Sequence, residues 1–204
     1  MSAGTREKLL LTAMHLYGEQ GIHAVSLRTI SAAAGSKNSA AMHYHFNNKL
    51  GVIDALVEFL AGHIYAIAIE QEFDKRIEVS TSLRESVRLS LRPLAELQRR
   101  YDWGSAGIRF LSHLLIETEA ELDEITRRHF SAFYLQADTY LANHLPALDG
   151  ETRRLRMLFA TITIFHGFAA RASLRHSTFG RLNETADDVL LNQLVDYLAG
   201  GLQA

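Results

Sequence analysis

The chain has 204 residues, of which 48% are hydrophobic and 22% charged, an ordinary globular composition with enough length to bury a core. It contains no cysteine, which excludes disulfides, thiolate zinc sites and cysteine nucleophiles. No signal peptide is visible and no apolar run approaches the roughly 18 residues of a membrane span. The sequence therefore predicts a cytoplasmic protein without a membrane partner.

The charge is unevenly distributed along the chain. The formal net charge is −2, but residues 1–50 contain five lysines or arginines and two acidic residues, a net charge of +3. Residues 51–204 contain 16 basic and 21 acidic residues, a net charge of −5. A small basic head on an acidic body is typical of nucleic-acid binding, and chance is the alternative explanation.

Apolar residues recur at spacings of three and four along almost the whole chain, which predicts an all-α fold. Four helices are expected first, over roughly 6–20, 27–34, 38–44 and from 47 onward. The apolar face of the first comprises Leu9, Leu10, Ala13, Met14 and Tyr17. Thr5 and Gly21 bound this helix, Ser26 is a good N-cap for the second, and Gly35 stops the second.

Five further helices are expected, over roughly 83–100, 105–116, 119–144, 151–175 and 184–200. Ser82 and Thr118 each stand three residues before a glutamate, which is the spacing of a capping box. The last helix follows Asn183 and ends at Gly200-Gly201. Residues 73–81 and 176–183 are expected to be loops.

Residues 26–46 have the pattern of a helix-turn-helix motif. Two short helices flank the tight turn at Gly35, so the second can be presented as a rigid rod that fits the major groove of DNA. Its exposed residues would be Lys37, Asn38, Ser39, His43 and Tyr44, all of which can donate hydrogen bonds. Lys49 opens the next helix, where a cation opposes the helix dipole unless an anion such as a phosphate is present.

Residues 5–56 resemble the N-terminal domain of TetR-type (tetracycline-repressor-like) transcriptional regulators. The family's first helix ends in an aromatic residue and then a glycine, here within Leu16-Tyr17-Gly18-Glu19-Gln20-Gly21. A capping Thr or Ser, an Ile-Ala pair and an Ala-Gly pair follow, here Ser26, Ile30-Ser31 and Ala34-Gly35. The third helix carries Tyr-His-Phe with a lysine three residues on, here Tyr44-His45-Phe46 and Lys49. Ser31, His43 and one extra residue between Gly35 and Phe46 depart from the common pattern.

The resemblance implies a set of DNA contacts. Phosphate contacts are implied for Ser26, Arg28, Lys37, Tyr44, His45 and Lys49. Base-edge contacts are implied for Asn38, Ser39 and His43, and Ala40 and Ala41 would meet a thymine methyl. Core packing is the alternative for His45 and the preferred role for Phe46.

The resemblance also implies a division into a DNA-binding domain, 1–50, and a helical effector-binding and dimerisation domain, 51–204. The dimer interface would comprise Phe159, Ile162, His166, Gly167, Ala170, Leu191, Leu194, Val195 and Leu198. The effector pocket would be lined by Trp103, Arg109, Phe110, His113, Phe130, Tyr134 and Phe165. The alternative is that these side chains pack only in the chain's own core.

The predicted function is a ligand-responsive DNA-binding transcriptional regulator. It would act as a repressor, binding a palindromic operator as a homodimer until a small-molecule effector releases it. A helical interaction module without DNA binding and a helical enzyme remain alternatives. The ten histidines include no Glu-x-x-His or His-Glu-x-x-His pattern, and no phosphate loop or Gly-x-Ser-x-Gly occurs. No catalytic residue, cofactor or metal site is therefore predicted.

Overall fold

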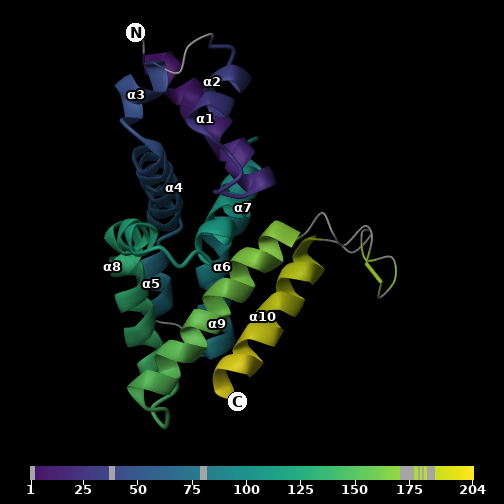
Figure 1. Cartoon of the computed structure of the whole chain (residues 1–204). Helices are drawn as coiled ribbons and strands as arrows, with labels where there is room; N and C mark the ends of the chain where they lie inside the picture. The colour runs from purple at the N-terminus through teal and green to yellow at the C-terminus, as the bar shows by residue number, and fades with distance from the viewer. Residues whose placement is uncertain are drawn as a thin grey trace. The chain divides into compact units, whose positions relative to one another are not determined.

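The computed structural model describes residues 3–36, 40–78, 82–170, 177, 178, 180, 182 and 187–204. These residues form ten helices and no strand (Figure 1), which confirms the all-α prediction. The helices are α1 (Ala3–Gln20), α2 (Leu27–Ala33), α3 (Ala40–Phe46), α4 (Lys49–Glu70), α5 (Phe73–Glu78), α6 (Leu83–Arg100), α7 (Gly104–Leu114), α8 (Ala120–His144), α9 (Gly150–Ala169) and α10 (Asp187–Gln203).

Side-chain caps define several helix starts. The Ser26 hydroxyl accepts a hydrogen bond from the Thr29 amide at 3.1 Å, which confirms the predicted N-cap of α2. The Ser82 hydroxyl accepts from the Glu85 amide at 3.2 Å at the start of α6. Asp149 caps α9, where one of its carboxylate oxygens accepts from two amides at 2.9 Å each. These bonds satisfy amides that have no partner within the helix.

The segment expected to be a loop at 73–81 contains a helix, α5. Phe73 and Ile77, four residues apart, are both buried and pack in one cluster with Leu89 of α6. A spacing of four places both side chains on one helix face. Tertiary packing of this pair therefore stabilises a short helix that local signals did not indicate.

Other boundaries shift by a few residues. α1 begins at Ala3 rather than after Thr5. α8 begins at Ala120, with the carbonyl of Glu119 accepting the first helical bonds, so Thr118 is not its cap. α10 continues through Gly200-Gly201 to Gln203, because Leu202 is buried in the core and holds the last turn. The expected cap Asn183 lies outside the described residues.

The chain divides into two compact units. Unit 1 comprises Met1–Ile64 and Leu97–Ser131, and unit 2 comprises Tyr65–Glu96 and Ala132–Ala204. Helices α4, α6 and α8 each contribute residues to both units.

The core of unit 1 is built on the packing of α1 against α7. The predicted apolar face of α1 is confirmed, because its five members are all at most 2% exposed. The rings of Tyr17 and Phe110 lie 5.9 Å apart. At Gly18 the two backbones approach so closely that a Cβ would lie 2.7 Å from the carbonyl oxygen of Ala106. The Tyr17-Gly18 pair in the last turn of α1 thus fits the surface of α7.

The core of unit 2 joins α6, α9 and α10. Its buried members are Leu83, Val87, Leu91, Leu145, Val195, Leu198 and Leu202. One face of α9 packs against this cluster through Ala160, Ile164 and Phe168. α9 and α10 run side by side (Figure 1), and Leu194 of α10 lies beside Gly167 of α9.

α4 corrects the expectation that no stretch approaches the length of a membrane span. Within the described part of the chain it is the one helix long and apolar enough to cross a membrane by length and composition. Half of its apolar window is buried, and Val52, Leu56 and Leu60 have no exposed surface. A core helix passes the same test, so α4 is weak evidence for a span.

Candidate functional site

The turn between α2 and α3 is set by backbone geometry. Gly35 has a φ of +78°, a conformation that favours glycine. The Ser36 amide donates to the Ser31 carbonyl at 2.9 Å and closes the turn. Ser26 and Arg28 are exposed at the start of α2. Three predicted DNA contacts, Lys37, Asn38 and Ser39, lie outside the described residues.

α3 has a buried and an exposed face. Met42 and Phe46, four residues apart, are at most 5% exposed and anchor the helix. His43 is exposed, and Tyr44 retains 72% of its surface. Ala41 is half-buried. The predicted core role of Phe46 is therefore confirmed, and a histidine and a tyrosine stand on the outer face.

The backbone fixes the hydrogen-bonding state of His43. Its Nδ1 lies 2.8 Å from the carbonyl oxygen of Asn47. Since a carbonyl only accepts, Nδ1 donates, and in the neutral ring Nε2 is left as an acceptor. An acceptor at this position would match an amino group on a base, either N4 of cytosine or N6 of adenine.

His45 faces the protein rather than solvent. Its ring lies 5.0 Å from that of Tyr44 and 6.1 Å from that of Phe46. Its Nε2 is buried and has no hydrogen-bond partner among the described residues. In this conformation Nε2 is shielded from solvent, and the ring contacts those of Tyr44 and Phe46.

Lys49, the first residue of α4, is also turned inward. It is half-buried, and its ammonium nitrogen lies 5.9 Å from the centroid of the Tyr17 ring. Burial lowers the pKa of Lys49, and the nearby carboxylates of Glu117 and Glu119 act in the opposite direction. The cap of α4 comes instead from Asn48, whose side-chain oxygen accepts from the Gly51 amide at 2.9 Å.

Five of the seven predicted pocket residues belong to unit 1. Phe110 is fully buried against Tyr17, and Phe130 is 8% exposed. Arg109 and His113 are half-buried on α7. The Trp103 ring stacks on that of Tyr101 at 4.6 Å. It also lies 5.0 Å from each of the rings of Phe59 and His63 on α4. Phe110 thus serves the α1–α7 core.

The other two predicted pocket residues, Tyr134 and Phe165, are half-buried in unit 2. Burial, with a smaller contribution from Tyr65, raises the pKa of Tyr134 to about 12. The phenol therefore stays protonated to a higher pH than an exposed tyrosine.

The predicted dimer residues are divided between two environments. Val195 and Leu198 of α10 lie in the core of unit 2, and Leu191 and Leu194 pack against it. α9 has no fully buried residue, although its sequence is rich in apolar side chains. Its large exposed hydrophobic residues are Leu155, Leu158 and Phe159, which retain 50%, 49% and 59% of their surface. On α10, Val189 and Tyr197 are also exposed.

Sequence reasoning missed the long-range polar contacts in the described part of unit 1, of which two are the shortest. His129 Nε2 donates to the carboxylate of Asp54 at 2.8 Å, across 75 positions of sequence. His23 Nε2 lies 2.8 Å from a carboxylate oxygen of Glu117, across 94 positions. No local spacing signals either contact, because each depends on how distant helices pack.

Two family models match the chain. The family described as "Bacterial regulatory proteins, tetR family" matches residues 9–56. The family described as "Tetracyclin repressor-like, C-terminal domain" matches residues 88–201, more than half of the chain. No curated protein sequence matches.

Solved structures with the same fold include three regulators. The fatty acid degradation regulator FadR from Bacillus halodurans has a TM-score of 0.64 and 16% identity, covering 100% of this chain and 97% of that chain. FadR from Bacillus subtilis, in complex with stearoyl-CoA, has a TM-score of 0.63 and 16% identity, covering 97% of each chain. The ketosteroid regulator KstR2 of Mycobacterium tuberculosis has a TM-score of 0.61 and 16% identity, covering 99% of this chain and 95% of that chain.

Proposed function

The chain belongs to the TetR family of transcriptional regulators, and we propose that it represses transcription as a homodimer bound to a palindromic operator. This family membership confirms the prediction that the chain is a ligand-responsive DNA-binding regulator rather than an enzyme. The observation that carries the proposal is the two-faced α3, in which Met42 and Phe46 anchor the helix while His43 and Tyr44 stand on its exposed face.

α3 enters the major groove with its exposed face toward the bases. His43 reads one base edge through Nε2, and the half-buried Ala41 meets a thymine methyl. Ser26, Arg28 and Tyr44 contact phosphates on either side, because all three are exposed and can donate hydrogen bonds. Lys37, Asn38 and Ser39 complete the interface as predicted from the sequence. His45 supports Tyr44 from below.

Lys49 joins the phosphate contacts only after it leaves the Tyr17 ring. The lysine side chain has enough rotatable bonds to do so. Its half-buried position beside two carboxylates means that DNA competes with Glu117 and Glu119 for its charge.

The homodimer forms through the exposed face of α9. Leu155, Leu158, Phe159, Ile162 and His166 recur at spacings of three and four, so they share one side of the helix. The opposite side packs on the core through Ala160, Ile164 and Phe168. An exposed apolar stripe of this kind marks an interaction surface. Two α9–α10 pairs related by a two-fold axis would cover it as a four-helix bundle.

Domain 1–50 binds DNA, and a small-molecule effector binds the helical domain 51–204. Effector binding releases the protein from its operator. α4 is the connection, since it begins at Lys49, shortly after α3, and continues to Glu70 within domain 51–204. The effector shifts the equilibrium only through its different affinities for the two states. Stearoyl-CoA, which the Bacillus subtilis structure contains, is the first probe to test. The protein acts in the cytoplasm, where its DNA partner lies.

Salt dependence of DNA binding tests this function. A fluorescently labelled random duplex is titrated with the full chain at several salt concentrations, and anisotropy reports the affinity. Neutralised phosphates release counterions, so the logarithm of the affinity should fall linearly with the logarithm of the salt concentration. Absence of binding at low salt would contradict the proposal.

A further inference from the structure

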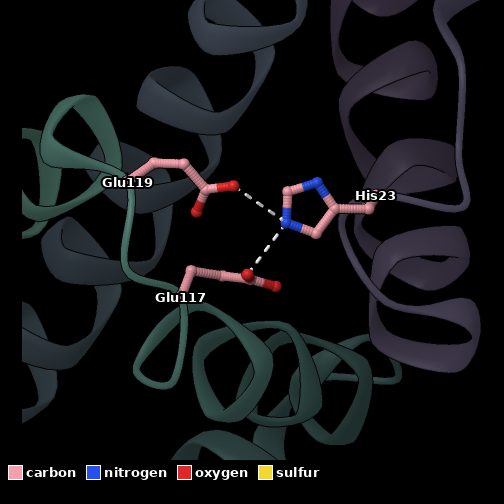
Figure 2. A group of neighbouring side chains, drawn as sticks. All are labelled: His23, Glu117 and Glu119. Carbon is pink, nitrogen blue, oxygen red and sulfur yellow. Dashed lines mark hydrogen bonds and ion pairs between the residues drawn. The ribbon is translucent and has the colours of Figure 1, made fainter.

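Three metal-ligating side chains converge on one face of unit 1 (Figure 2). His23 lies in the turn after α1, and Glu117 and Glu119 lie in the segment between α7 and α8. His23 Nε2 is 2.8 Å from an oxygen of Glu117 and 3.2 Å from an oxygen of Glu119. The three ligand atoms all lie within 4.8 Å of one another. We propose that His23, Glu117 and Glu119 bind a divalent transition-metal ion.

The distances suit an ion held between the three side chains. A zinc ion with bonds of about 2.0–2.2 Å to imidazole nitrogen and carboxylate oxygen separates neighbouring ligand atoms by roughly 3–3.5 Å. The distances from His23 Nε2 to the two carboxylate oxygens, 2.8 and 3.2 Å, therefore need to lengthen only slightly to admit the ion. Figure 2 shows both carboxylates directed at the same edge of the imidazole ring.

The backbones that carry the ligands are fixed by the fold. The Glu117 amide donates to the Leu114 carbonyl at 3.2 Å. The Glu119 carbonyl accepts from two amides of the first turn of α8, at 3.0 and 3.1 Å. His23 follows Gly21, whose amide bonds to the Tyr17 carbonyl at 3.0 Å. The ligands therefore come from two separate turns, and an ion would join them.

The donor set selects the class of ion. One imidazole nitrogen with two carboxylate oxygens suits zinc and its first-row neighbours, and three protein ligands leave a coordination position for water. Magnesium prefers six oxygen ligands and retains its waters. With His23 neutral, the two carboxylates and the nearby Lys49 leave a local charge of about −1, which attracts a divalent cation.

The ion couples the DNA-binding segment to α8. His23 precedes α2 by only a few residues, whereas Glu119 directly precedes α8. Metal binding would raise the thermal unfolding midpoint of the full chain, because the ion binds the folded state and the unfolded chain lacks the assembled site.

The test is calorimetric titration of the full chain, first dialysed against a chelator, with zinc chloride at neutral pH. His23→Ala and Glu117→Gln remove ligands. His15→Ala and Glu121→Gln are matched controls, because both residues are exposed on the neighbouring helices α1 and α8. Circular dichroism without metal verifies that all variants have wild-type helicity.

We expect one zinc ion per chain in the wild type and in both controls, no comparable binding of magnesium, and affinity reduced roughly tenfold or more in each ligand variant. Lys49→Gln should tighten zinc binding, since it removes a competing positive charge. Equal zinc affinity in the wild type and His23→Ala would overturn the proposal and leave the cluster as an ion pair only. The readout involves no DNA, so it stands apart from the test of repression.

Discussion

The tautomer of His43 determines which base edges this α3 side chain can recognise. The hydrogen bond from His43 to the Asn47 carbonyl sets that tautomer. Nδ1 donates to the backbone, so Nε2 of the neutral ring accepts. His43→Ala should remove the preference for one base at one position of each half-site, with little change in affinity for random DNA. Site selection from a random duplex pool, run on the wild type and the variant, measures this. An unchanged preference would exclude His43 as a base-reading residue.

The sequence predicts that Lys49 contacts a phosphate, but in the structure its ammonium group lies against the Tyr17 ring. If it reaches a phosphate in the complex, Lys49→Ala should weaken binding to all duplexes and reduce the salt slope by about one unit. Lys75→Ala is the control, because Lys75 is exposed on α5 and pairs with Glu72. A wild-type slope in Lys49→Ala would mean that Lys49 remains against Tyr17 when DNA is bound.

Individual residues were predictable where their role is local. Ser26 caps α2 because its own neighbours supply the amide, and Phe46 is buried because it shares a helix face with Met42. The buried Nε2 of His45 and the inward turn of Lys49 were not predictable. The ammonium group of Lys49 lies near the Tyr17 ring and the carboxylates of Glu117 and Glu119. The two glutamates are far from Lys49 in the sequence.

The close contact between α1 and α7 predicts how a substitution at Gly18 changes the stability of the protein. In a helix interior, Gly→Ala normally stabilises by about 1 kcal/mol. At Gly18 the new Cβ would lie 2.7 Å from the Ala106 carbonyl oxygen, so the backbone must move. Because overpacking costs about 1–3 kcal/mol, Gly18→Ala should lower the free energy of unfolding.

Gly62→Ala in α4 is the matched control for this helix contact. Nothing lies within 4 Å of a Cβ at Gly62, so the substitution should stabilise by up to about 1 kcal/mol. Urea denaturation of both variants gives the comparison. A Gly18→Ala protein at least as stable as the wild type would show that α7 yields to the added methyl group.

At the scale of helices, sequence patterns located the elements and long-range packing adjusted them. Ser26 and Ser82 mark true helix starts. α5 was missed because a six-residue helix carries little periodicity, and its stability comes from Leu89 on another helix. α10 passes through Gly200-Gly201 since Leu202 beyond them is buried.

The proposed dimer is a property of the whole molecule. Phe159→Glu places a charge on the exposed stripe of α9, and sedimentation velocity should show a shift from dimer to monomer. Leu135→Glu is the control, because Leu135 is 70% exposed on α8 and lies outside that stripe. A dimer that persists in Phe159→Glu would place the interface elsewhere.

The sequence predicted that α9 and α10 are apolar but not which faces serve the chain's own core. Val195 and Leu198 were expected at the interface, yet they lie in the core of unit 2. A stripe of apolar residues looks the same whether it packs within one chain or between two. The exposed side of α9 could be identified only after the positions of α6 and α10 were known.

Site selection with the wild-type chain tests the central claim most directly. A pool of random duplexes is bound by the full protein, and the retained duplexes are amplified and sequenced over several rounds. A dimer that presents two copies of α3 should enrich an inverted repeat whose half-sites lie about one helical turn, or 10 base pairs, apart. Enrichment of no common sequence, or of a single half-site without a repeat, would contradict a dimeric repressor that reads DNA through α3.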